Sequence, residues 1–210
     1  MIPIASRCRF LLASLATVAT IALLAAPLQA NAATAPAVAP GCPYTPVTQP
    51  FAPWSDPADY FLAPDGGFEQ SGAGWTLRGS AVVATGGKPF RVGPAADRKS
   101  LRLPAGASAT TAPFCIGVEH RTMRFVANAV AASSLDVDVI YTDVARVERT
   151  MRIGAVAGAG RWAPTVVLPM IVNTLAAARG NAMNVRLRFT PRGTAPWSID
   201  DVYVDPYRVK

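Results

Sequence analysis

Apolar and polar residues alternate along several stretches of the chain. Residues 135–141 alternate aliphatic residues with aspartates, and residues 184–189 alternate apolar residues with arginines. A period of two places the two sets of side chains on opposite faces of an extended strand. Both stretches are therefore predicted strands, with Val139 and Phe189 directed into a core and the charged residues directed to solvent.

Shorter runs of the same kind recur from Trp54 onward and are separated by turn-forming residues. Further strands are predicted at 75–77, 80–84, 100–103, 109–115, 123–127, 147–153, 162–168 and 198–204. Clusters of glycine, proline and asparagine lie between them, and only residues 171–179 favour a short helix. Strands at this spacing, without long helices between them, predict an all-β fold built as an antiparallel sandwich.

The N-terminus has the pattern of a secretory signal peptide. Arg7 and Arg9 precede an apolar run over residues 10–24, and residues 30–32 (Ala-Asn-Ala) form a cleavage pattern. The run is about 15 residues long, short of the roughly 20 that cross a bilayer. We therefore expect cleavage after Ala32 and a secreted mature protein without an integral membrane segment, a retained anchor being the alternative.

Residues 33–53 are rich in alanine and proline. Prolines at this density exclude helix and strand interiors and favour an extended chain. The predicted organisation is a signal peptide at 1–32, an arm or linker at 33–53 and one sandwich domain at 54–210. Cleavage leaves about 178 residues, enough for a domain with its own core.

Two cysteines remain after cleavage, Cys42 and Cys115, because Cys8 lies in the signal peptide. An even pair in an oxidising compartment indicates a disulfide. This bond would join the arm to the sandwich. Two free thiols, one of them catalytic, are the alternative.

Composition narrows the function classes only slightly. Hydrophobic residues make up 51% of the chain and charged residues 16%, which is typical of a packed globular protein. The formal net charge of +7 permits attraction to anionic glycans, wall polymers or membranes, and coding bias toward arginine is the alternative explanation. No motif of a nucleic-acid-binding module is present, so we expect no nucleic-acid partner.

Segments near the two ends of the predicted domain resemble a known family. Residues 65–69 read DGGFE, residues 74–77 read GWTL, and residues 197–204 read WSIDDVYV. This order resembles the galactose-binding-like jelly-roll domains, among them many non-catalytic carbohydrate-binding modules of secreted proteins. The resemblance covers residues 61–205 and implies a jelly-roll fold that binds extracellular or cell-wall carbohydrate.

Many of these modules bind a structural Ca²⁺ where the first and last strands meet. By this resemblance, Glu69 and Asp200 are expected to be its carboxylate ligands. Alternation also places Asp200 on one face with Val202 and Val204, so a core position for the valines would bury the carboxylate. Hydrogen bonds from backbone amides to Asp200, beside a solvated Glu69, are the alternative.

Sugar binding in this fold would use exposed aromatic side chains beside polar groups. Trp54 and Tyr60 are the candidates, although clamping of the arm explains both equally well. Trp75, Trp162 and Trp197 lie in or beside predicted strands, so we expect them to pack in the core.

A second candidate surface carries Arg124, Arg186 and Arg188. If their strands are neighbours, these residues form a basic patch suited to uronates, sulfates or phosphates. A solvated face on which Asp136 and Asp138 pair with the arginines is the alternative.

Catalysis has little support in the sequence. Neither G-x-S-x-G nor H-E-x-x-H occurs, and the one histidine, His120, is expected in an exposed turn. A small acid/base hydrolase would need acidic residues such as Asp136 and Glu148 to converge. We expect a secreted, non-catalytic binding domain, with a secreted structural or adhesion protein of the same fold as the alternative; the sequence leaves the oligomeric state open.

Overall fold

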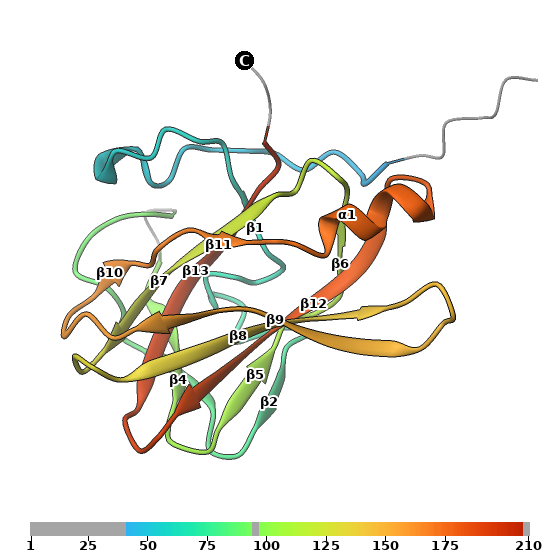
Figure 1. The fold of residues 1–210 in the computed structure, drawn as a ribbon. Coiled ribbons are helices and arrows are strands. Elements are labelled where there is room, and N and C mark those ends of the chain that lie inside the picture. Colours follow the sequence, from blue (N-terminus) through green and yellow to red (C-terminus); the bar gives the residue numbers. More distant parts are fainter. Residues whose placement is uncertain (1–40, 94–96, 208–210) are drawn as a thin grey trace, which may run out of the picture. The chain divides into compact units, whose positions relative to one another are not determined.

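A computed structural model describes residues 41–93 and 97–207. The signal peptide and cleavage site predicted within residues 1–32 lie outside this range, as does the first part of the arm. Strands β1–β13 form two antiparallel sheets that pack face to face (Figure 1), so the predicted all-β sandwich is confirmed. Among the described residues, no helix combines the length and apolarity needed to span a membrane.

One sheet has seven strands, and its central order is β10-β7-β13-β4-β3. These strands are β10 (Ala163–Pro164), β7 (Thr122–Ala129), β13 (Trp197–Asp205), β4 (Lys99–Leu103) and β3 (Val82–Thr85), with β1 (Phe61–Leu62) paired to β13 and β11 (Leu168–Pro169) paired to β7. The last strand of the chain therefore lies at the centre of this sheet.

The other sheet has six strands, in the order β2-β5-β12-β8-β9 with β6 beside β12. They are β2 (Thr76–Arg78), β5 (Ser108–Thr110), β12 (Met183–Arg192), β8 (Ser134–Thr142), β9 (Glu148–Ala157) and β6 (Phe114–Ile116). The helical segments are η1 (Ala52–Trp54), α1 (Asn173–Ala176) and η2 (Ala177–Arg179), the last two within the predicted helix at 171–179.

Two predicted strands are interrupted. The stretch 109–115 is divided between β5 and β6 around Pro113, which has no N–H to give to a sheet. The stretch 162–168 is likewise divided between β10 and β11, and the exposed Val166 and Val167 lie between them.

The core lies between the sheets and is built from the predicted inward positions. Val139 on β8 and Phe189 on β12 are both fully buried, as the alternation predicts. The Phe189 ring stacks on Trp75 at a centroid distance of 5.9 Å and contacts the edge of Phe125, on the opposite sheet, at 5.2 Å.

The N-terminal segment, residues 41–60, covers part of the outer face of the seven-stranded sheet. Thr48 pairs with Tyr60, and Phe51 is fully buried with Tyr60, Val126 and Tyr203 in a second apolar cluster. Phe51 lies within the segment predicted as an arm. Part of that segment therefore packs as an element of the domain.

A disulfide joins Cys42 to Cys115, 73 residues apart in the chain. Cys115 lies on β6, so the bond fixes the start of the described chain to the six-stranded sheet. The predicted pairing is present.

Candidate functional site

The two aromatic residues predicted to bind a ligand lie at the covered part of the sheet. Tyr60 is buried, and its hydroxyl donates a hydrogen bond to Asp56 Oδ2 at 2.8 Å. Burial, together with this hydrogen bond to a carboxylate, raises the pKa of Tyr60 well above its usual value. Trp54 is half-buried, with its ring 5.1 Å from that of Phe90. Tyr60 clamps the N-terminal segment, whereas Trp54 keeps part of its surface accessible.

The three arginines predicted to share a patch lie on different sheets. Arg186 and Arg188 belong to β12, whereas Arg124 belongs to β7 of the other sheet. Arg124 donates to Asp56 Oδ2 and to the Thr165 carbonyl, both at 2.7 Å. The condition for a common patch therefore fails, and Arg124 anchors the N-terminal segment.

The outer face of the six-stranded sheet is a network of ion pairs. Asp138 binds Arg188 at 2.9 Å and Arg152 at 3.3 Å, and Asp136 binds Arg152 and Arg192. This is the arrangement given above as the alternative, in which the aspartates pair with the arginines. These carboxylates are held by guanidinium groups, so they are poorly placed to act as an acid and a base.

The opposite face of the molecule, on the seven-stranded sheet, has a groove that the N-terminal segment leaves open. It is a hollow of about 350 Å³. Its walls are formed by Val82, Ala84, Arg102, Leu103, Pro104, Asn128, Ala129, Val130, Pro196, Trp197 and Ser198. Most of these residues come from strands β3, β4, β13 and β7, which are neighbours in the sheet.

Sheet register places the polar residues of this groove in one row. Arg102 lies opposite Ser198, and Ser198 lies opposite Asn128 on its other side. Val82 lies opposite Arg102 and ends the row on β3. Because residues directly opposite share a face of a sheet, these side chains all point outward across four strands.

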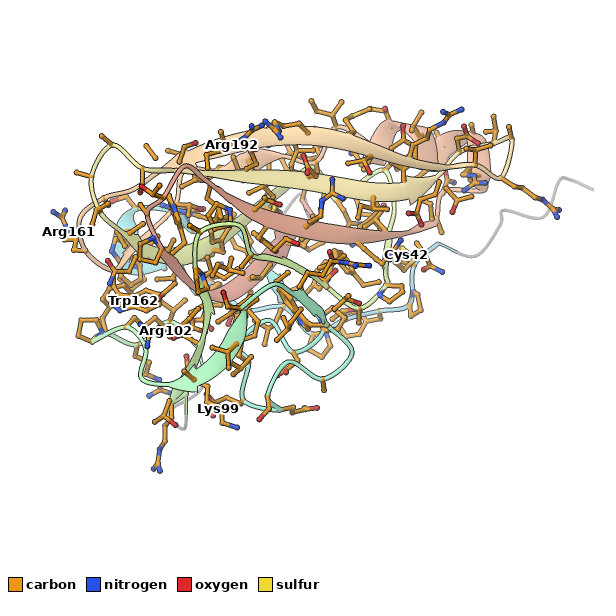
Figure 2. The ribbon with its side chains drawn as sticks, turned by 90° about the horizontal axis from the view of Figure 1, so that it is seen from below. Cys42, Lys99, Arg102, Arg161, Trp162 and Arg192 are labelled. Carbon is orange, nitrogen blue, oxygen red and sulfur yellow. A yellow bond between two sulfur atoms is a disulfide. The ribbon has the colours of Figure 1, made fainter. Side chains whose placement is uncertain are left out.

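Trp162 extends the row beyond Asn128. The pairing of Ala163 with Ala127 places the preceding residue, Trp162, beside Asn128 on β7. Its side chain is half-buried against the second apolar cluster, and Figure 2 shows Trp162 and Arg102 on the same side of the molecule. With strands about 4.8 Å apart, the row from Val82 to Trp162 is about 19 Å long.

The polar side chains of the row have no polar partner in the part of the chain that the structure describes. Arg102, Asn128 and Ser198 make no side-chain hydrogen bond or ion pair with another described residue. A guanidinium, an amide and a hydroxyl group are therefore available to a ligand. We call Val82, Arg102, Ser198, Asn128 and Trp162 the groove row.

A buried ionic cluster lies on the same face, next to the groove. Lys88 Nζ is 2.9 Å from Asp200 Oδ2 and 2.5 Å from Asp201 Oδ2, and it also pairs with Asp97. The side chains of Lys88, Asp200 and Asp201 are 3%, 0% and 0% exposed. We call these four residues the Lys88 cluster.

The electrostatics of the Lys88 cluster follow from its burial. Burial raises the pKa of Asp200 to about 8, with the charge of Asp201 acting in the same direction. Burial also raises the pKa of Asp201 to about 6, although Lys88 opposes the change. For Lys88, burial lowers the pKa, but the charges of Asp201 and Asp200 outweigh it and the net direction is upward.

A β-bulge in β13 brings both aspartates to this cluster. The register with β7 shifts between Asp200 and Tyr203, and Asp201 adopts a φ of 51°. Val202 and Val204 belong to the core, whereas Asp200 faces the outer side of the sheet. The prediction that Asp200 shares a face with these valines is wrong, because the extra residue reverses the alternation. Asp200 is buried by the loop that carries Lys88.

Glu69, the other predicted calcium ligand, is exposed. Its Oε1 accepts hydrogen bonds from the backbone N–H groups of Arg98 at 2.6 Å and Lys99 at 2.7 Å. Burial acts to raise the pKa of Glu69, but these two hydrogen bonds outweigh it and hold the pKa below its usual value. The acidic residues whose oxygens converge are Asp97, Asp200 and Asp201.

Two of the three converging acids are closed to a substrate. Asp200 and Asp201 have no exposed surface, so a molecule from solution cannot reach the pair even though their pKa values are raised. His120 is buried as well, and its Nδ1 accepts a hydrogen bond from the Gly117 N–H at 2.7 Å. The expectation that His120 is exposed is wrong.

No protein-family model matches the sequence, and no curated protein sequence matches it. A structure of family 22 carbohydrate-binding and xylanase modules from Clostridium thermocellum, complexed with xylohexaose, is 16% identical with a TM-score of 0.44, over 68% of this chain and 28% of that chain.

Two single modules are similar over most of their own length. The family 22 xylan-binding domain of Paenibacillus barcinonensis Xyn10C is 12% identical with a TM-score of 0.44, over 69% of this chain and 93% of its own. A family 61 carbohydrate-binding module complexed with β-1,4-galactotriose is 15% identical with a TM-score of 0.41. The similarity covers 68% of this chain and 96% of that module. The jelly-roll resemblance thus has counterparts among solved structures, but identities and scores this low transfer no ligand to the groove.

Proposed function

We propose that this protein is an exported, non-catalytic domain that binds extracellular carbohydrate in the groove of the seven-stranded sheet. One observation carries the proposal. The groove row presents an arginine, a serine and an asparagine, none bonded to another described residue, in one line that ends at a partly buried tryptophan. An extended ligand lying across the strands would contact each of these groups in turn.

The chemistry of the row suits a sugar polymer. Asn128 and Ser198 both donate and accept hydrogen bonds, as the hydroxyl groups of a sugar do. The ring of Trp162 offers an apolar face for a pyranose ring. Val82 and Val130 are 50% and 58% exposed and give the groove apolar margins.

Arg102 adds a preference for acidic sugars. Its guanidinium can bind a carboxylate through two parallel hydrogen bonds, and it has no acidic partner among the described residues. A uronic acid in the polymer would provide that partner. The preferred ligand is therefore a polysaccharide that contains both neutral and uronic-acid units.

Export and the absence of catalysis are parts of the proposal. The sequence pattern at residues 1–32 supports export, and a disulfide between Cys42 and Cys115 suits an oxidising compartment. Against catalysis, Asp136 and Asp138 are bound by arginines and Asp200 is inaccessible.

The proposal is tested by binding of the mature protein, residues 33–210, to an array of glycans and cell-wall polysaccharides at low and high salt. We expect binding to a defined set of glycans that persists at high salt and is stronger when uronic acids are present. Binding to every acidic polymer that disappears at high salt would indicate charge attraction without recognition. Absence of binding would contradict the proposal and favour a structural or adhesion role.

A further inference from the structure

The Lys88 cluster has the composition of a cation site. Oxygens of Asp97, Asp200 and Asp201 lie within 4.8 Å of one another, and Asp200 and Asp201 are fully buried. Asp201 Oδ1 is buried without a hydrogen-bond partner among the described residues. Buried carboxylates are costly unless a cation neutralises them, and oxygen ligands of this kind suit Ca²⁺.

The position between these oxygens is taken by the ammonium group of Lys88. Nζ contacts one oxygen of each of the three carboxylates. A divalent cation bound to the same oxygens would be repelled by the ammonium at close range and would have to displace it. The residues therefore do not fit a calcium ion while Lys88 is in place.

We infer that Lys88 is the resident cation of this site and takes the place of a structural metal. The ion pairs of Lys88 then stabilise this part of the fold, and its stability does not depend on calcium. The calcium expected at Glu69 and Asp200 from the family resemblance stays a prediction, and the same experiment decides between the two.

The backbone around the cluster is shaped to enclose it. A Cβ on Gly93 would lie 2.9 Å from Asp201 Oδ1, and a Cβ on Gly87 would lie 3.3 Å from Asp200 Oδ2. A side chain at Gly93 would require the Asp201 carboxylate to move, and one at Gly87 would be in tight contact with Asp200. The left-handed φ of Asp201 and the bulge beside it are the matching adaptation of β13.

Lys88 also fixes a loop beside the groove. Phe90, two residues further on, packs against Trp54, and Ala84, before the loop, lines the groove. The ion pairs to β13 therefore hold the loop between β3 and β4 onto the outer face of the sheet. Without them, we expect this loop and the contact with Trp54 to loosen.

The inference is tested by thermal unfolding of the mature protein in EDTA and in millimolar Ca²⁺. We expect the wild-type Tm to be the same in both. Lys88→Met keeps the length of the side chain but leaves the carboxylates without a cation, so its Tm in EDTA should fall by roughly 6–15 °C. Ca²⁺ should then raise the Tm of this variant, because a metal can enter the vacated position.

Arg98→Ala is the matched control, because Arg98 is a nearby exposed basic residue whose side chain makes no contact in the cluster. Its Tm should stay within about 2 °C of the wild type in both buffers. A wild-type Tm that rises in Ca²⁺ and falls in EDTA would overturn the inference, and so would a Lys88→Met variant as stable as the wild type. The comparison of the wild-type Tm in EDTA with that in Ca²⁺ tests the inference even if Lys88→Met does not fold.

Discussion

Replacing Phe189 by alanine is expected to lower the free energy of unfolding by about 3–5 kcal/mol. Phe189 has no exposed surface and lies between the sheets, where it contacts Trp75 on one side and Phe125 on the other. Truncation removes these ring contacts and leaves a cavity that the two sheets cannot fill without moving. The loss should therefore approach the upper range of core substitutions.

Urea unfolding followed by tryptophan fluorescence measures this loss. Val166→Ala is the control, because Val166 is 65% exposed and its truncation should change the free energy of unfolding by less than about 0.5 kcal/mol. Phe189→Leu, with a loss of about 1.5 kcal/mol or less, replaces the alanine variant if that variant does not fold. A loss below about 1 kcal/mol for Phe189→Ala would mean that β12 presents its other face to the core.

Removing the disulfide is the second change with a large expected effect. The bond between Cys42 and Cys115 closes a loop with a sequence separation of 73 residues. In the chain-entropy account, a loop of this length stabilises the fold by roughly 4 kcal/mol. The double variant Cys42→Ser/Cys115→Ser should lose a comparable amount in the same unfolding experiment.

Unfolding of the wild type with its disulfide reduced controls for any effect of the serine side chains themselves. The reduced protein and the double variant should unfold at similar urea concentrations, both lower than that of the oxidised wild type. Unfolding of the double variant at the wild-type urea concentration would contradict this prediction, because non-covalent contacts such as those of Phe51 and the Asp56–Arg124 ion pair would then suffice to hold the N-terminal segment.

The sheet faces could be predicted because alternation is a local property. Residues 135–141 and 184–189 each carry one apolar face, and the core residues Val139 and Phe189 follow from it directly. The break at Pro113 follows from its missing N–H, which alternation alone does not register, and nothing in the alternation marks the break at Val166 and Val167. The bulge at Asp201 has no signal in a pattern of alternation, and it reverses the faces on either side of it.

The candidate site could not be predicted in the same way. Arg102, Asn128 and Ser198 come from three strands that are far apart in the sequence, and only the order of strands in the sheet brings them into one row. The order of strands also places Arg124 and Arg188 on different sheets, although both residues occupy outward positions in the alternation pattern.

The position of Lys88 among the buried carboxylates could not be predicted from the sequence either. The motif around Asp200 indicates a site for a positive charge, and the raised pKa of Asp200 agrees with its burial. Nothing in the local sequence around Lys88 distinguishes it from a solvated lysine. Its role depends on a loop that folds across β13, a contact between residues 112 positions apart.

The groove and the Lys88 cluster lie on the same outer face of the seven-stranded sheet. The N-terminal segment and the loop of Lys88 cover one half of the outer face, where Phe51 and Phe90 pack. The groove row crosses the other half, which stays open. Trp162, at the end of the groove row, packs against the cluster in the covered half.

The most direct measurement is the affinity of the mature protein, and of its Arg102→Ala/Asn128→Ala variant, for the glycan bound best on the array. Neither side chain makes a hydrogen bond or an ion pair with another described residue, so the variant should keep the wild-type Tm. We expect its dissociation constant to be at least about tenfold higher, whereas Arg188→Ala, on the opposite face, should bind like the wild type. Equal affinity of the groove variant and the wild type would contradict the assignment of the groove as the carbohydrate site.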